Sequence, residues 1–214
     1  MISVKKFVCN MLEENCYVVS DESGECIIID CGAFTDDERN AISSYIEQEA
    51  LKPVRLIATH GHLDHNFGNA MMKDAYGLEV EVASEDASLI KNARVHAKHF
   101  YGFELENDLP PVGGNISDGD VIAFGSHKME VISTPGHSAG SVCLYCREEG
   151  VLFTGDTLFR MSIGRTDLGG GSMMKIIQSL RRIAQLPDQT VVYPGHGQPT
   201  TIGEELCQNP FMER

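Results

Sequence analysis

Thr59-His-Gly-His-Leu-Asp-His65 is the stretch of this sequence that decides its fold and its chemistry. It places four candidate metal ligands within six positions, namely His60, His62, Asp64 and His65. Imidazoles this close repel one another when protonated, and they gain little from packing. A divalent cation turns the same crowding into coordination bonds. The stretch therefore predicts a metal site.

The sequence before this stretch predicts a rigid support for it. Thr35-Asp-Asp-Glu38 is a capping box, and the apolar spacing that follows predicts a helix over residues 36–50. Pro53 ends that helix, and residues 54–59 read as a short buried strand. The ligands begin where this strand stops, so a rigid backbone positions side chains that remain reachable.

Three more candidate ligands lie far along the chain in similar surroundings. His137, Asp156 and His196 each stand beside glycine in a tight loop. Each loop follows an expected strand, over residues 128–133, 151–154 and 190–193. Taken with the cluster at 60–65, these positions predict one shared centre with seven ligands, more than a single tetrahedral zinc needs.

The remaining pattern predicts two similar halves. Further strands are expected over residues 2–9, 16–20, 26–30, 79–83, 120–124 and 141–147. Further helices are expected over residues 66–76 and 172–185, and another is expected to be capped by Ser84 and to reach Arg94. Each half runs from a strand meander to a helix and a strand. Two stacked sheets with helices outside is the natural packing of such halves.

Composition narrows the function further. The formal charge of −14 disfavours binding to nucleic acid or to anionic membranes. The N-terminus lacks the apolar stretch of a signal peptide, and no segment approaches a membrane span. The seven cysteines are scattered, which predicts reduced thiols in a cytoplasmic protein, and Cys143 and Cys146 should face opposite sides of one strand.

The Thr-His-x-His-x-Asp-His run at 59–65, the isolated His137, Thr154-Gly-Asp156 and Gly195-His196-Gly197 resemble the metallo-β-lactamase superfamily. Gly155-Asp-Thr-Leu-Phe159 and Gly164-Arg-Thr-Asp167 are similar to its glyoxalase II group, especially the short bacterial members. The resemblance implies an α/β fold, a four-layer αββα sandwich. It also implies one domain over residues 1–214, without the C-terminal helical domain of the longer glyoxalase II enzymes.

The resemblance also assigns the ligands to two divalent metal ions. It places one metal on His60, His62 and His137, and the second on Asp64, His65 and His196, with Asp156 bridging both. Zinc is the expected metal, and His/Asp ligands also suit iron or manganese. Asp30 is expected to support a ligand or a loop from behind.

The implied activity is hydrolysis of a thioester such as S-lactoylglutathione by a metal-bridging hydroxide held by Asp64 or Asp156. Arg165 stands where glyoxalase II enzymes hold a carboxylate of glutathione. The expected partner is thus a small acyl-thiol, with oligomeric state left open. Two alternatives remain, a mononuclear-iron persulfide dioxygenase and a non-enzymatic zinc protein.

Three other histidines carry weaker expectations. His96 and His99 either line the substrate cleft or lie on a solvated helix. His127 follows a turn and is expected to be exposed.

Overall fold

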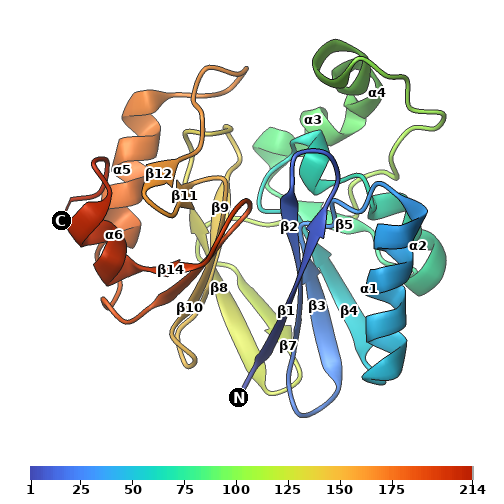
Figure 1. The fold of residues 1–214 in the computed structure, drawn as a ribbon, viewed down its shortest axis with the longest axis horizontal. Coiled ribbons are helices and arrows are strands. Elements are labelled where there is room, and N and C mark those ends of the chain that lie inside the picture. The colour runs from blue at the N-terminus through green and yellow to red at the C-terminus, as the bar shows by residue number, and fades with distance from the viewer. Residues whose placement is uncertain (214) are drawn as a thin grey trace.

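The computed structural model describes residues 1–213 as two stacked β-sheets with helices on both outer faces (Figure 1). Each of the two sheets has six strands. A small ribbon of two strands, β11 (Leu158–Phe159) and β12 (Ser162–Ile163), follows the second sheet's strand β10. The architecture is the αββα sandwich expected from the sequence.

The first sheet has the strand order β1-β2-β3-β4-β5-β6. Its strands are β1 (Ser3–Cys9), β2 (Glu14–Ser20), β3 (Glu25–Ile29), β4 (Lys52–Ile57), β5 (Val80–Val82) and β6 (Gly114–Asn115). The first three form the expected antiparallel meander, whereas β3 to β6 pair in parallel. The segments that follow β4 and β5 therefore start at the same edge of the sheet.

The second sheet has the order β14-β13-β10-β9-β8-β7. Its strands are β7 (Val121–Phe124), β8 (His127–Ser133), β9 (Val142–Cys146), β10 (Val151–Gly155), β13 (Val191–Pro194) and β14 (Thr200–Thr201). β9 runs antiparallel to both β8 and β10, and β10 runs parallel to β13. The loops bearing His137, Asp156 and His196 consequently leave β8, β10 and β13 at one edge.

The interior between the sheets is apolar and formed by alternate residues of the strands. Ile27 and Ile29 of the first sheet pack in one buried cluster with Met129, Leu144 and Phe153 of the second. Burying such side chains stabilises the sandwich by roughly 1.5–3 kcal/mol each, which fixes the two sheets against one another.

Helices cover the outer faces of both sheets. α1 (Asp36–Gln48) and α2 (Asn69–Tyr76) pack on the first sheet, and α5 (Met173–Ile183) and α6 (Ile202–Gln208) pack on the second (Figure 1). The capping box at Thr35 is present, since its hydroxyl accepts from the Glu38 N–H and the Glu38 carboxylate accepts from the Thr35 N–H.

Cys143 and Cys146 belong to different buried clusters, as the strand geometry requires, and both are free thiols. Within residues 1–213, no helix is long and apolar enough to cross a membrane.

The expectation of one helix capped by Ser84 is wrong. The segment forms three separate helical pieces, a 3₁₀ turn (Ser84–Asp86), α3 (Ala87–Lys91) and α4 (Ala93–His96), followed by a π-helical turn (Ala97–Tyr101). The Ser84 hydroxyl donates to the neighbouring Glu85 carboxylate instead of capping a helix. Apolar periodicity alone did not reveal these breaks.

The expectation that His127 is exposed is also wrong. Its side chain is buried at the start of β8, the opposite end of that strand from the His137 loop. Its Nδ1 lies 3.0 Å from Asp21 Oδ2, and its Nε2 lies 2.9 Å from Glu149 Oε1. His127 therefore links turns of the two sheets through two carboxylates.

Candidate metal centre

The backbone of residues 59–62 is held in place by neighbouring side chains. The Thr59 N–H and hydroxyl both donate to the Asp30 carboxylate, at 2.6 and 2.7 Å. The Asn66 amide donates to the carbonyls of His60 and His62, at 3.2 and 2.7 Å. A 3₁₀ turn over Leu63–His65 then brings Asp64 and His65 next to the same point. Hydrogen bonds within the protein thus fix the shape of the loop.

The first group of clustered side chains consists of three histidines from both sheets. His62 Nδ1 lies 2.8 Å from His137 Nε2, and His137 Nε2 lies 3.2 Å from His60 Nε2. His60 and His62 follow β4 of the first sheet, whereas His137 follows β8 of the second. Ligand nitrogens of the three rings all lie within 4.8 Å of one another, which is close enough for them to bind one cation.

The second group consists of Asp64, His65 and His196, whose ligand atoms also lie within 4.8 Å of one another. His196 Nε2 lies 3.4 Å from Asp64 Oδ2, and His65 Nε2 lies 3.7 Å from the same oxygen. Only His196 of this group is partly exposed, with 23% of its side chain accessible. The group is therefore buried on one side and open on the other.

Asp156 lies between the two groups. Its Oδ1 is 3.3 Å from His65 Nε2, and its Oδ2 is 3.5 Å from His137 Nε2. Within residues 1–213, His65 Nε2 and Asp156 Oδ1 are buried without a hydrogen-bond partner. Unpartnered buried polar atoms are costly, and a cation bound between them would satisfy both. The residues present fit a metal centre.

Three of the imidazoles are oriented by acceptors behind them. His137 Nδ1 faces the Arg165 carbonyl at 2.8 Å, His196 Nδ1 faces the Leu12 carbonyl at 3.0 Å, and His65 Nδ1 faces Asp30 at 3.1 Å. An oxygen acceptor at Nδ1 keeps the hydrogen there and leaves the Nε2 lone pair for the centre. The contact expected of Asp30 is present.

The electrostatics of the cluster divide the histidines into two kinds. Burial and neighbouring imidazoles lower the pKa of His60 well below its usual value, and burial together with His137 lowers the pKa of His62 to about 4. Both rings are neutral at pH 7 and can offer a lone pair. Burial opposes a charge on His65 as well, but Asp156 and the other carboxylates raise the pKa of His65 well above its usual value.

The two carboxylates of the cluster are ionised. Burial opposes their charge, but His65 and the other nearby imidazoles together outweigh burial and lower the pKa of both Asp64 and Asp156. Without a metal, protons on the imidazoles compensate these carboxylates. A divalent cation would take the place of those protons, so metal binding and proton release are coupled.

Two residues that the sequence did not single out also hold Asp64. The Tyr101 hydroxyl donates to Asp64 Oδ1 at 3.2 Å, and the Asn10 amide donates to the Asp64 carbonyl at 2.8 Å. Asn10 lies 54 residues away, in the turn between β1 and β2. No local pattern marks either contact, because both depend on how the loops pack.

Arg165, expected to contact substrate, contributes its carbonyl to His137 and keeps its side chain exposed. Its guanidinium makes two hydrogen bonds to Asp167, at 2.7 and 2.8 Å. In this arrangement the charge of Arg165 is already paired.

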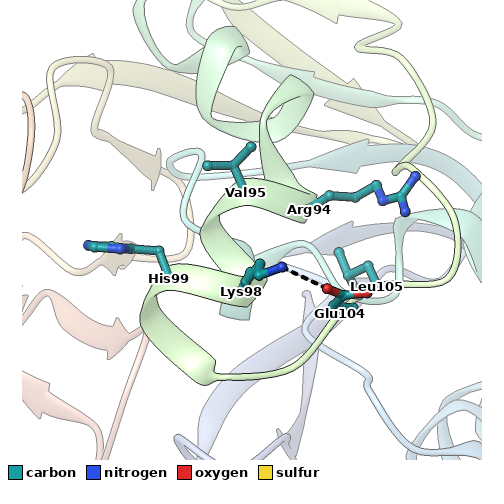
Figure 2. Close-up of a pocket in the computed structure, with 6 residues that line it drawn as sticks. All are labelled: Arg94, Val95, Lys98, His99, Glu104 and Leu105. Atoms are coloured by element: carbon teal, nitrogen blue, oxygen red, sulfur yellow. Dashed lines mark hydrogen bonds and ion pairs between the residues drawn. The ribbon is translucent and has the colours of Figure 1, made fainter.

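His96 and His99 are not among the seven clustered side chains. A surface pocket of about 590 Å³ lies along this segment, lined by Arg94, Val95, Lys98, His99, Glu104 and Leu105 (Figure 2). Figure 2 shows His99 pointing away from the ion pair between Lys98 and Glu104, whose charged atoms are 2.8 Å apart. The pocket is therefore distinct from the residues of the metal centre.

The sequence profile described as the metallo-beta-lactamase superfamily matches residues 10–196. The chain belongs to the metallo-β-lactamase superfamily. Members of this superfamily are metal-dependent hydrolases, and the His/Asp cluster described above fits a site for divalent metals.

Relatives and solved structures agree with this assignment. Hydroxyacylglutathione hydrolase GloC of Haemophilus influenzae is 33% identical over 202 residues, which cover 94% of this chain and 93% of GloC. The structure of the BLEG-1 B3 metallo-β-lactamase superposes with a TM-score of 0.89 at 32% identity, covering 99% of this chain and all of BLEG-1. That of TTHA1623 in a di-iron-bound form gives a TM-score of 0.86 at 35% identity, covering 98% of this chain and all of TTHA1623.

Proposed function

We propose that this superfamily member hydrolyses thioesters at a dinuclear metal centre formed by the seven clustered side chains. The observation that carries the proposal is the pair of three-ligand groups with Asp156 between them, 3.3 Å from His65 and 3.5 Å from His137. A thioester suits such a site because its thiolate leaving group departs without being protonated. The similarity to GloC, named for its action on a hydroxyacylglutathione, supports the same substrate class.

Each ligand group has a proposed cation. His60, His62 and His137 would hold one divalent ion, Asp64, His65 and His196 would hold a second, and Asp156 would contact both. When bound, such ions supply Lewis acidity to a carbonyl group and lower the pKa of a coordinated water to about 7. Zinc is the proposed metal, with manganese or iron as alternatives, and the di-iron form of TTHA1623 supports iron among them.

The side chains themselves orient the reaction. Asp64 and Asp156 are ionised, so their oxygens can accept a hydrogen bond, or a proton, from an attacking water. Tyr101 fixes Oδ1 of Asp64 and leaves Oδ2 on the side of His196. Asp30 fixes the ring of His65 from behind. The carboxylate of Asp64 and the ring of His65 are therefore preorganised by contacts within the protein.

Arg165 is the proposed contact for a carboxylate of the thiol portion, such as glutathione. Its guanidinium would exchange Asp167 for the substrate carboxylate, since both present two oxygens to the same pair of N–H groups. This exchange keeps the number of charge-assisted hydrogen bonds constant, so it favours binding only modestly.

A persulfide dioxygenase with one iron on His60, His137 and Asp156 is the competing candidate. All three residues are present in the cluster, so ligand identity does not separate the two activities. The likeness to BLEG-1 adds β-lactam hydrolysis as a further outcome to be measured.

A substrate panel with metal analysis of the same sample tests the proposal. It contains S-lactoylglutathione, an acylated N-acetylcysteamine, a chromogenic cephalosporin, and glutathione persulfide with oxygen uptake recorded. We expect about two equivalents of metal and cleavage of one or both thioesters. One iron with oxygen uptake, or turnover of the cephalosporin alone, would overturn the proposal.

A further inference from the structure

Asp86 connects two loops that carry proposed metal ligands. Its side chain is buried, with 1% of the residue exposed. Oδ2 accepts from the Gly61 N–H at 2.9 Å and from the Ser138 hydroxyl at 2.6 Å, and Oδ1 accepts from the Gly140 N–H at 2.7 Å. Gly61 lies between His60 and His62, and Ser138 directly follows His137. One carboxylate therefore holds both loops.

The two loops belong to different sheets. Residues 59–65 follow β4 of the first sheet, and residues 134–141 join β8 to β9 of the second. Asp86 itself follows β5, the neighbour of β4. The Ser138 hydroxyl also lies 2.7 Å from the Ser141 hydroxyl, which extends the network through the second loop. The contact thus ties the sheets together beside the metal centre.

Two glycines allow this close approach. A Cβ added at Gly61 would lie 2.6 Å from the Asp86 carbonyl oxygen, and one added at Gly140 would lie 2.8 Å from the Asp86 Cγ. Both distances are shorter than real contacts of a Cβ. The backbone of each loop is therefore fitted against Asp86 in a way that other residues would prevent.

We propose that Asp86 is a positioning residue that sets the spacing of His60, His62 and His137 for a divalent cation. The inference rests on the ligands proposed above. The 2.8 Å separation of His62 Nδ1 and His137 Nε2 spans the two loops that Asp86 joins. Asp64 and His65 are held by other contacts, from Asn10, Tyr101 and Asp30. Loss of Asp86 should therefore weaken the three-histidine site selectively.

Two variants of different severity test this. Asp86→Ala removes all three accepted hydrogen bonds. Asp86→Asn keeps one carbonyl oxygen but turns an amide N–H₂ towards at least one N–H or O–H donor, so it loses part of the network. Asp21→Asn is the matched control. Asp21 is also buried, and it also links the two sheets, since it accepts from the Ser126 N–H. It lies beside His127, at the end of β8 opposite the His137 loop.

The measurement is zinc binding by metal-free protein in competition with a chromophoric chelator, with circular dichroism to show that each protein is folded. A His62→Ala variant identifies which binding step belongs to the three histidines. We expect Asp86→Ala to weaken that step about 10–100-fold, Asp86→Asn to weaken it less, and the other step to change little. Asp21→Asn should alter neither step.

Three results would overturn the inference. These are an unchanged three-histidine step, an equal loss at both steps, and the same selective loss in Asp21→Asn. If Asp86→Ala does not fold, Asp86→Asn decides by the same criteria. The outcome for the proposed function is separate. If the Asp86 variants bind zinc more weakly than wild-type protein at the three-histidine site, but zinc-loaded wild-type protein cleaves no thioester, the proposed function is refuted and this inference stands.

Discussion

The Oδ1 atom of Asp156 lies 3.3 Å from Nε2 of His65, and within residues 1–213 neither atom makes a hydrogen bond. The two residues come from different sheets, since Asp156 follows β10 and His65 lies beyond β4. Buried polar atoms normally have hydrogen-bond partners. This pair of atoms is therefore the position in the sandwich where a bound cation would satisfy both.

Replacing Asp156 with alanine separates a catalytic centre from a structural metal site. We expect the metal-free variant to keep its secondary structure, because the apolar core between the sheets does not involve Asp156. Thioester kcat/KM should fall by more than the roughly 10–100-fold seen when a residue behind a metal ligand is changed. Steady-state kinetics and circular dichroism measure the two effects. Full turnover combined with an unfolded metal-free protein would point to a structural role instead.

Metal affinity should increase with pH. Burial opposes the charges on His65 and His196, but nearby carboxylates, Asp64 and Asp156 among them, raise the pKa of both rings above the usual value. A cation must displace these protons, so binding is weaker below the raised pKa values and releases protons there. Zinc competition at pH 6 and pH 8, with proton release followed by an indicator dye, measures this. Equal affinity at both pH values with no proton release would contradict it.

His127 and its two carboxylate partners, Asp21 and Glu149, should make the free energy of unfolding depend on pH, whether or not metal is bound. Hydrogen bonding to Asp21, followed by that to Glu149, raises the pKa of His127, and the pKa of Glu149 is lowered chiefly by its bond to His127. The His127 contribution is complete below its unfolded value of about 6.5 and is lost as pH rises through the raised folded value. In strong acid, protonation of Asp21 and Glu149 removes the stabilising contribution of His127 again.

We therefore expect His127→Gln to lower the urea midpoint more at pH 5.5 than at pH 9, measured with a chelator present. His99→Gln serves as the control, since His99 lines an open surface pocket. The same destabilisation at both pH values would show that His127 contributes packing only.

Arg165→Gln should raise KM for S-lactoylglutathione several-fold while leaving kcat nearly unchanged, if the guanidinium holds a substrate carboxylate. Turnover of an uncharged acyl-N-acetylcysteamine should not change. Arg160→Gln is a suitable control because it removes the same charge from a nearby turn. An equal KM in all three proteins would remove Arg165 from the binding site.

The clustering of the candidate ligands could be expected from the sequence because most of these residues lie just beyond the ends of strands. A short buried strand followed by glycine and histidine has few ways to place the imidazole, and parallel strands bring such ends to one edge. His137 and His196 accordingly both lie within 4 Å of Asp156, and His137 lies beside His60, although more than fifty residues separate these histidines along the chain.

Apart from Asp30, the residues that hold the candidate ligands from behind could not be predicted in the same way. Asp86 resembles an ordinary acidic residue at a helix start, and its three partners lie 25, 52 and 54 residues away. His127 was expected at the surface because its neighbours are turn residues, yet Asp21 and Glu149 come from turns of both sheets to bury it. Contacts of this kind depend on tertiary packing, which no local pattern encodes.

Metal stoichiometry measured beside thioester turnover tests the central claim most directly. Metal-free protein would be titrated with zinc while hydrolysis of S-lactoylglutathione and of an acyl-N-acetylcysteamine is followed. The account predicts that turnover of a thioester rises with zinc and reaches its plateau at about two equivalents per chain. Full activity at one equivalent, or no thioester turnover with both sites filled, would contradict it.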